Sequence, residues 1–370
     1  MSTGARHDVE VAVVGAGVVG SAVALALARR GASVALLEAE AEPARCASGT
    51  NSGILHTGFD STPGELETEL ILRAAPLREP VLAALGIPVL RCGAIMRGDG
   101  ERLDPLAAGA RRNGVAVNRA DSQTLEVPGE AVTDPVVYTR ALAAEAERHG
   151  AEVWLGFALA AVEAGVRLRA EDGRAVRARV LVNCAGLFAD AVARLLGDES
   201  FSIYPRKGEF LVFDPPGAGP PERILLPVPS ERTKGVIVFP TIDGKTVAGP
   251  TAVDLEDKLD WSVRPQARAE ILAKAAPMYP PLEGAEPIAA YAGLRPAGRG
   301  VNYVIGRWQA CAELVNVAAI RSTGLTASVA IAERVAGFVG ELGIELGAPR
   351  DLIGGRLPQL GRPWWQKQAA

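Results

Sequence analysis

The glycines within residues 15–20, Gly-Ala-Gly-Val-Val-Gly, have the spacing of a dinucleotide-binding turn. They follow an apolar run at 9–14, which predicts a buried parallel strand, and open an Ala/Leu-rich helix that Gly31 ends. The first glycine of this pattern allows a tight turn, the second lets the backbone approach a pyrophosphate, and the third lets the helix pack on the strand. The helix start offers unpaired N–H groups and a positive dipole end to the phosphates. The residues predicted to contact the dinucleotide here are Gly15, Gly17, Val18, Val19 and Gly20.

A second predicted strand, 33–37, is followed by Glu38, an acid at the position expected for ribose binding. Its carboxylate can accept hydrogen bonds from both ribose hydroxyls, and its charge disfavours the 2′-phosphate of NADP. Strand, helix, second strand and acid therefore occur in the order that a dinucleotide site requires. This pattern alone is compatible with FAD or NAD, and a glycine-rich turn in an apolar sheet is the alternative.

Residues 45–59, Arg-Cys-Ala-Ser-Gly-Thr-Asn-Ser-Gly-Ile-Leu-His-Thr-Gly-Phe, are rich in small and hydroxyl-bearing side chains. Such a segment lets its backbone approach a ligand closely and supplies many hydrogen-bond donors. A solvent loop is the alternative, but Ile54, Leu55 and Phe59 would be poorly placed in one. We therefore predict that this segment lies against a ligand.

At this segment the sequence resembles the FAD-dependent D-amino-acid-oxidase-like superfamily. More narrowly, it resembles the branch that contains flavin-dependent glycerol-3-phosphate dehydrogenases and L-2-hydroxyglutarate oxidases. In that branch an N-S-x-x-x-H-x-G stretch followed by P-G-x-L lies at the flavin, and residues 51–58 and 63–66 match it. The other matching segments are 178–190, 204–210, 234–251, 291–296 and 316–326. One departure is Lys207, which stands where the family usually has an arginine that could bond in bidentate fashion.

The resemblance implies FAD as the cofactor and adds contacts beyond the first glycine turn. A strand that ends near Cys184 is followed by small residues that pass close to the adenosine. The loop at 323–326 is expected to offer backbone donors to the flavin. The residues that the resemblance adds to the cofactor site are Ala47, Ser48, Thr50, Asn51, Ser52, Ala185, Gly186, Thr323, Gly324, Leu325 and Thr326.

The catalytic candidates are His56 and Arg295. His56 is the one of the three histidines in the flavin-facing segment, where an imidazole can take a hydroxyl proton as hydride leaves carbon for flavin N5. A structural hydrogen bond and covalent flavin attachment are the alternatives for this residue. Arg295 can clamp a carboxylate or phosphate of the substrate and stabilise negative charge on the reduced flavin, with a buried ion pair as the alternative. Arg321 and Lys234 are further candidates for binding the substrate, although Lys234 could equally be a solvated turn residue.

The predicted fold class is α/β, with an FAD-binding Rossmann-type (glutathione-reductase-like) domain and a mostly antiparallel α+β substrate domain. The expected FAD-binding domain comprises 1–75, 140–200 and 300–345, the substrate-binding domain 76–139 and 201–299, and the C-terminal tail 346–370. The clearest element of the substrate domain is a strand-turn-strand pattern at 234–250 that turns at Asp243 and Gly244. The Pro/Gly-rich stretch 215–229 is predicted to be a surface loop.

Composition and motifs limit the partners. The net charge of −4 and the lack of a basic-aromatic stripe exclude a nucleic acid held by bulk charge. The four cysteines lie far apart without a CxxC pair, so we expect no metal site and a reducing compartment. The N-terminus leads straight into a strand, which favours a cytoplasmic protein without a signal peptide. Trp364 and Trp365 are expected to pack on this chain or on a dimer mate, and a peripheral membrane contact is the alternative.

These features predict an FAD-dependent oxidoreductase that takes hydride from the CH–OH of a small anionic substrate, with glycerol 3-phosphate as the first choice. L-2-Hydroxyglutarate or another 2-hydroxy acid is the second choice, and the CH–NH of an amino acid is the third. A flavin-binding protein without turnover is the alternative from a different class. Oxygen, a quinone and a soluble carrier stay open as electron acceptors, and the chain is expected to be a monomer or a homodimer.

Overall fold

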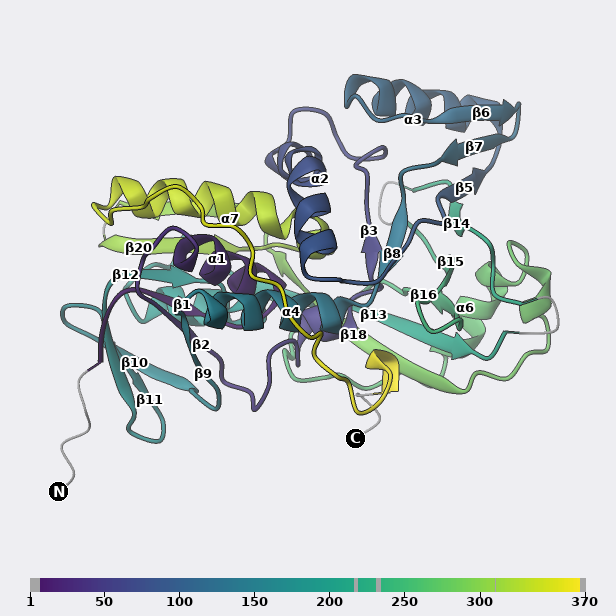
Figure 1. The fold of residues 1–370 in the computed structure, drawn as a ribbon. Helices are drawn as coiled ribbons and strands as arrows, with labels where there is room; N and C mark the ends of the chain where they lie inside the picture. The colour runs from purple at the N-terminus through teal and green to yellow at the C-terminus, as the bar shows by residue number, and fades with distance from the viewer. Residues whose placement is uncertain (1–6, 216–218, 231–233, 310, 367–370) are drawn as a thin grey trace.

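Two large β-sheets, each with its own helices, make up the two halves of the molecule (Figure 1). The structure is a computed structural model that describes residues 7–215, 219–230, 234–309 and 311–366. One half contains β1 (His7–Val14) and α7 (Gly324–Glu341), and the other is built around the long pair β13 (Ile203–Phe213) and β18 (Ala289–Gly298). The described helices include none that is long and apolar enough to cross a membrane.

The first sheet has eight strands and is parallel at its centre. β1 pairs in parallel with β2 and β12, β2 with β9, and β12 with β20, whereas the β10–β11 hairpin and β19 are antiparallel. The central parts of β1, β2 and β12 read Val-Ala-Val-Val, Val-Ala-Leu-Leu and Val-Leu-Val, as expected for strands that are buried on both faces. The strands are β1 (His7–Val14), β2 (Val34–Leu37), β9 (Glu152–Trp154), β10 (Leu159–Glu163), β11 (Arg167–Ala170), β12 (Ala175–Asn183), β19 (Val304–Trp308) and β20 (Cys311–Ala318).

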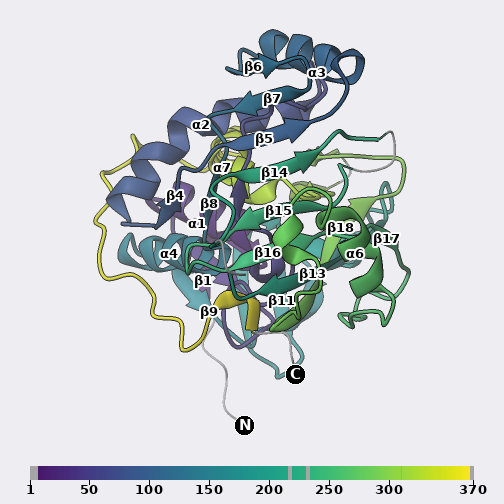
Figure 2. The same ribbon diagram turned by 90° about the vertical axis from the view of Figure 1, so that its right-hand side faces the viewer.

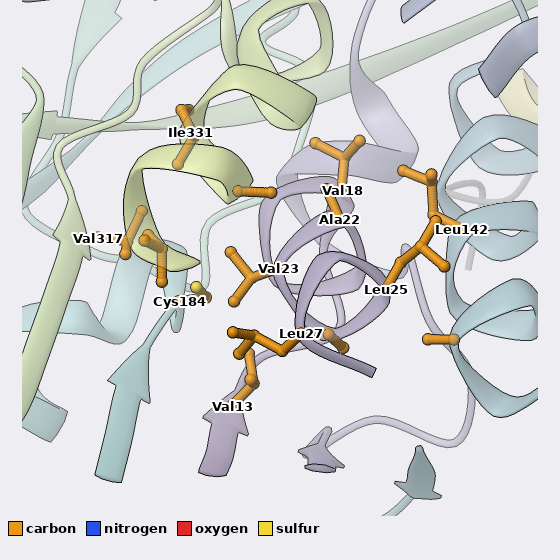
Figure 3. Packing of buried hydrophobic residues seen from close by; sticks show 14 of the residues in the cluster. Val13, Val18, Ala22, Val23, Leu25, Leu27, Leu142, Cys184, Val317 and Ile331 are labelled. Carbon is orange, nitrogen blue, oxygen red and sulfur yellow. The ribbon is translucent and has the colours of Figure 1, made fainter. Parts of the chain in front are cut away.

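Three helices bury their apolar side chains against this sheet and one another. α1 (Val18–Ala28) packs between α4 (Pro135–Arg148) and α7 (Gly324–Glu341), and Figure 3 shows Leu25 of α1 facing Leu142 of α4. α4 begins at a conventional cap, because the Asp134 carboxylate accepts hydrogen bonds from the next two free backbone N–H groups and proline fills the first helical position. The N-cap residue of α1 is Gly17, which has no side chain that could accept a hydrogen bond from the helix start. The short helix α5 (Ala189–Arg194) follows β12 and packs on β20.

The second sheet has nine strands and is antiparallel except where β14 pairs with β5. This confirms the predicted α/β class with a mostly antiparallel second part. α6 (Ala267–Ala275) packs on β13 and β16, and α3 (Gly100–Arg112) covers β7 at the far end of the sheet (Figure 2). The strands are β5 (Ala94–Arg97), β6 (Asn118–Asp121), β7 (Thr124–Val127), β13 (Ile203–Phe213), β14 (Ile224–Pro227), β15 (Ile237–Pro240), β16 (Thr246–Gly249), β17 (Val253–Asp254) and β18 (Ala289–Gly298).

A third, small sheet and a long helix join the two halves. The sheet contains β3 (Ile54–Leu55), β8 (Ala131–Thr133) and β4 (Val89–Leu90), and α2 (Leu66–Ala84) packs on α7 beside it. The remaining short helices are η1 (Ala47–Thr50), η2 (Gly186–Phe188), η3 (Pro280–Leu282) and η4 (Trp364–Gln366).

The prediction for 215–229 was wrong in part, whereas the hairpin that follows it was placed correctly. Ile224–Pro227 forms β14, an internal strand between β5 and β15. Prolines on both sides of this short apolar run favour a loop by local rules, but its tertiary partners on both edges outweigh them. β15 and β16 pair in antiparallel fashion around a turn in which Gly244 has φ +77°.

The C-terminal segment crosses from the first half to the second (Figures 1 and 2). Near its start, the Arg350 guanidinium donates to the carbonyls of Ala28 and His149. Near its end, Trp364 and Trp365 are each only 4% exposed and join the core of the second half. The Trp365 indole N–H donates to Asp243 at 3.0 Å. The tryptophan pair therefore packs on its own chain.

Candidate active site

A cavity of about 560 Å³ opens where β1, β12 and the loop after β2 meet. The turn between β1 and α1 forms one wall, residues 44–51 a second, and the turn after β12 a third. The start of α7 closes one end. The residues predicted from the sequence that line this cavity are Gly15, Gly17, Val18, Val19, Glu38, Ala47, Ser48, Asn51, Ala185, Gly186, Arg321, Gly324 and Leu325.

The glycine turn has the geometry that its spacing predicts. Gly15 has φ +101°, a conformation that other residues rarely adopt, and a Cβ there would lie 2.5 Å from the Cys184 carbonyl oxygen. A Cβ on Gly20 would lie 1.9 Å from the Gly15 carbonyl oxygen. Gly20 therefore sets how closely α1 packs on the turn and does not itself line the cavity, whereas Gly17 lies on its wall.

Two side chains from other parts of the chain complete this wall. The Glu38 carboxylate accepts hydrogen bonds from the backbone N–H of Ala16 at 2.6 Å and of Glu40 at 3.0 Å. Burial raises the pKa of Glu38 above its ordinary value, and these two bonds oppose the rise. The Ser48 hydroxyl accepts from the Val18 N–H at 2.9 Å and so caps α1 from 30 residues away. An acid, a helix N-terminus and close-packed glycines around one cavity fit the ADP half of FAD.

Hydrogen bonds tie the segment after η1 to the start of α7. The Asn51 amide donates to the Ser322 carbonyl at 3.3 Å and accepts from the Gly53 N–H at 2.9 Å. The Thr326 hydroxyl accepts from the His56 backbone N–H at 3.0 Å. Segments 270 residues apart in the chain therefore form one end of the site.

The other predicted cofactor residues have structural partners. The Thr50 hydroxyl donates to the Cys46 carbonyl, and β18 passes so close that a Cβ on Gly293 would lie 3.0 Å from Thr50. The Thr323 hydroxyl contacts Glu67 at 2.7 Å. Ser52 is half-buried. Five predicted cofactor residues do not line the cavity, although each is the chain neighbour of a residue that does: Gly20, Thr50, Ser52, Thr323 and Thr326.

His56 faces a buried carboxylate. Its Nδ1 lies 3.1 Å from Oε2 of Glu130, and its side chain is 21% exposed. The other oxygen of Glu130 accepts from the backbone N–H of Thr57 at 2.7 Å and from the Thr57 hydroxyl at 2.8 Å. The Nε2 of His56 makes no hydrogen bond with a described residue. This ring nitrogen is the one available to a ligand.

A second ion pair, between Lys234 and Asp60, interacts electrostatically with the first: His56 acts on Asp60, and Glu130 acts on Lys234. Lys234 donates to the Asp60 carboxylate at 2.8 Å. The lysine side chain is 55% exposed, so its ammonium is only partly desolvated. This partial desolvation opposes the charge, yet Asp60 outweighs it and raises the pKa of Lys234. The charges of Glu67 and Glu130 act in the same direction, so the ammonium stays protonated near neutral pH.

Arg321 belongs to a network at the start of α7. Its guanidinium donates to Asn302 at 3.0 Å and approaches Glu67 at 3.4 Å. Glu67 also accepts from the Asn302 amide at 2.7 Å, and the Tyr303 hydroxyl bonds the neighbouring Thr323. Burial raises the pKa of Glu67, but its bonds to Asn302 and Thr323 outweigh burial and leave this pKa below its ordinary value. Arg321 is therefore a charged wall residue that Glu67 holds in place.

Arg295 is held by backbone carbonyls rather than by an acid. Its Nε donates to Arg206, and its Nη2 donates to Lys207 and Thr251, at 2.9–3.0 Å. Burial lowers the pKa of Arg295 to about 10, and the charge of Arg206 adds to this effect. The alternative of a buried ion pair does not hold, because no acid bonds this guanidinium among the described residues. Its Nη1 bonds none of them either and is free for a substrate anion.

Three further residues of types that could do chemistry have structural roles. Lys207 is fully buried and forms an ion pair with Asp260 at 2.8 Å, so it anchors β13. His149 is the C-cap residue of α4, and burial lowers its pKa, which disfavours the charged imidazolium. Burial raises the pKa of the Cys46 thiol to about 12, which makes it a packing residue.

Sequence reasoning missed the acids that position the candidate cations and base. Glu130, Asp60 and Glu67 lie 74, 174 and 254 residues from His56, Lys234 and Arg321 respectively. Local patterns carry no information on such pairings. The available signal was a lone acid beside an apolar strand or glycine: Glu130 precedes Ala-Val-Thr, and Asp60 follows Gly-Phe.

The family model of FAD dependent oxidoreductases, the DAO family, matches residues 10–337. The chain belongs to this family. It is 27% identical over 345 residues to a glycerol 3-phosphate dehydrogenase of Caloramator mitchellensis, which covers 87% of this chain and 72% of that protein. It is 26% identical over 353 residues to a glycerol 3-phosphate oxidase of Mycoplasma pneumoniae, with 87% and 92% covered. An L-2-hydroxyglutarate dehydrogenase of Escherichia coli (strain K12) is 27% identical over 266 residues, with 65% and 63% covered.

Solved structures share the fold. The dithionite-reduced L-alpha-glycerophosphate oxidase from Mycoplasma pneumoniae with FAD bound has a TM-score of 0.87 at 24% identity, over 96% of this chain and 100% of that one. A glycine oxidase from Geobacillus kaustophilus has a TM-score of 0.79 at 23% identity, over 95% and 100%. The predicted family, fold class and FAD cofactor are confirmed, and the chain is an FAD-dependent oxidoreductase.

Proposed function

We propose that this oxidoreductase oxidises the CH–OH group of a small anionic substrate, with glycerol 3-phosphate as the first candidate. The observation that carries the proposal is the free Nε2 of His56 in one electrostatic neighbourhood with the Lys234–Asp60 pair. A base and a cation thus both act electrostatically on the same carboxylate, that of Asp60. An alcohol needs a base to remove its hydroxyl proton as the C–H bond breaks, whereas a neutral amine can lose hydride without one.

The residues divide the chemistry as follows. His56 Nε2 receives the hydroxyl proton, the carbinol carbon loses hydride, and its C–O bond becomes a carbonyl. Bound FAD supplies the acceptor for that hydride at flavin N5. Residues of the glycine turn, Glu38 and Ser48 would hold the ADP half, and the loops at 51–52 and 323–326 would hold the flavin.

The substrate's phosphate or carboxylate would be bound by N–H donors that are not used in bonds to other described residues. An ammonium has three N–H donors, and Asp60 takes one of those of Lys234. Arg295 contributes Nη1, and Arg321 adds a further positive charge on the cavity wall. These groups orient the substrate carbon for reaction. They suit a phosphate or a carboxylate, which keeps L-2-hydroxyglutarate as the second candidate, in line with the similar proteins that carry that activity in their names.

The test is anaerobic reduction of the purified yellow protein by a substrate panel. The panel contains glycerol 3-phosphate, L-2-hydroxyglutarate, other 2-hydroxy acids and amino acids, and loss of the visible flavin band reports reduction. We expect rapid bleaching by glycerol 3-phosphate and none by amino acids. Bleaching by an amino acid alone, or by no member of the panel while dithionite still reduces the flavin, would contradict the proposed substrate class.

A further inference from the structure

Glu130 is a buried acid in contact with His56, and the chemistry above leaves it without a role. It is 1% exposed and precedes β8, at the junction of the small third sheet with the site. It is bonded by three groups: two of Thr57 at one oxygen and the His56 ring at the other. The nearby cation Lys234 also acts on it through space. A carboxylate so buried is stable only with such donors.

The donors around Glu130 decide which nitrogen of His56 carries a proton. The Thr57 backbone N–H can only donate, so Oε1 must accept. With Oε2 also an acceptor, His56 must present Nδ1–H to it. A neutral imidazole with its proton on Nδ1 has its lone pair on Nε2, the nitrogen without a protein partner.

We propose that Glu130 is a positioning residue that fixes His56 in the Nδ1–H tautomer and so makes Nε2 the base. This inference rests on the proposed function for the identity of the proton taken, but the tautomer itself does not depend on it. The contrasting account is that Glu130 only holds the Thr57 turn in place. The two accounts differ in what happens when the carboxylate becomes an amide.

Glu130→Gln separates them. The amide oxygen of glutamine can still accept from the Thr57 N–H, which preserves the turn. Its NH2 group then faces Nδ1, which must become an acceptor, and the imidazole proton moves to Nε2. The base is lost while the shape of the site is kept. Glu126→Gln is the matched control, because Glu126 is a carboxylate of the neighbouring β7 that pairs with Arg223 instead.

The first readout is the 15N NMR spectrum of histidine-labelled protein with FAD bound and no substrate. The chain has three histidines, so His56→Asn and His149→Gln assign the signals. We expect His56 to be protonated on Nδ1 in the wild type and in Glu126→Gln, and on Nε2 in Glu130→Gln. An Nε2–H tautomer in the wild type overturns the inference even if Glu130→Gln does not fold, and so does an unchanged tautomer in a folded Glu130→Gln.

The second readout is anaerobic flavin reduction by the substrate that the panel identifies. We expect Glu130→Gln to lower the limiting reduction rate by roughly 10²- to 10⁴-fold with little change in the substrate concentration for half-saturation. Glu130→Asp keeps the charge and should recover part of the rate. A rise in half-saturation alone would mean that Glu130 shapes the substrate pocket and would overturn the inference. If no panel member reduces the flavin, the proposed substrate class fails, and the NMR result still decides the role of Glu130.

Discussion

Replacing Gly20 with alanine should separate flavin binding from folding. The added Cβ would lie 1.9 Å from the Gly15 carbonyl oxygen, whereas ordinary contact begins at 3.4 Å, so α1 must move away by about 1.5 Å. The obstructing atom is backbone and cannot rotate aside. Overpacking of this kind costs about 1–3 kcal/mol. The same shift moves the helix N-terminus that should bind the pyrophosphate. We therefore expect the free energy of FAD binding to fall by much more than the free energy of unfolding.

The matched control is Gly337→Ala in α7, where an added Cβ meets nothing within 4 Å. Alanine at this exposed position inside a helix should raise the free energy of unfolding by about 0.5–1 kcal/mol. Flavin content after purification, titration of the apoprotein with FAD and urea unfolding give the comparison. The reasoning is refuted if Gly20→Ala binds FAD as tightly as Gly337→Ala does.

Three further predictions concern the cofactor acid, the C-terminal segment and acid stability. Glu38→Ala removes the carboxylate that the Ala16 N–H bonds, so FAD affinity should fall roughly 10- to 150-fold in a fluorescence titration; an unchanged affinity would remove Glu38 from the site. Trp364→Ala should lower the free energy of unfolding by about 3–5 kcal/mol in urea, because the side chain is 4% exposed; a change below about 1 kcal/mol would mean that the C-terminal segment is not docked in solution. Burial raises the pKa of Glu209, but its bonds to Arg264 outweigh burial and hold this pKa below its ordinary value of 4.5. Its contribution to stability is therefore present above pH 4.5 and is lost as the pH falls through the lower, folded value. Urea unfolding at several pH values should show this loss in the wild type and a smaller loss in Glu209→Gln.

The parts of the fold set by local patterns could be predicted from the sequence. The turn at Gly15, the acid at Glu38 and the β15–β16 hairpin each depend on residues within a few positions of one another. β14 could not be predicted in this way, because its flanking prolines favour a loop and only its pairing with β5 and β15 makes it a strand. The docking of Trp364 likewise depends on Tyr291. The two rings pack edge to face, with their centroids 5.3 Å apart.

The candidate site likewise combines features that local segments predict with features that depend on residues far away in the chain. The residue types that could do chemistry, His56 and Arg295, are recognisable because their segments resemble those of a known family. What makes them usable is set by partners far away in the chain. Glu130 decides which nitrogen of His56 is free, and backbone carbonyls rather than an acid hold Arg295, which leaves part of its guanidinium available. Ser48, which caps α1, was predicted as a cofactor contact, but its bond to the helix start required the structure.

The central claim is that His56 takes the proton from an alcohol whose carbon gives up hydride. The most direct measurement is the anaerobic rate of flavin reduction by glycerol 3-phosphate in the wild type, His56→Asn and His149→Gln, with dithionite as the reductant that needs no base. The account predicts that His56→Asn is slower by roughly 10²- to 10⁴-fold, that His149→Gln matches the wild type, and that dithionite reduces all three alike. Wild-type rates in a flavin-loaded His56→Asn protein would contradict it.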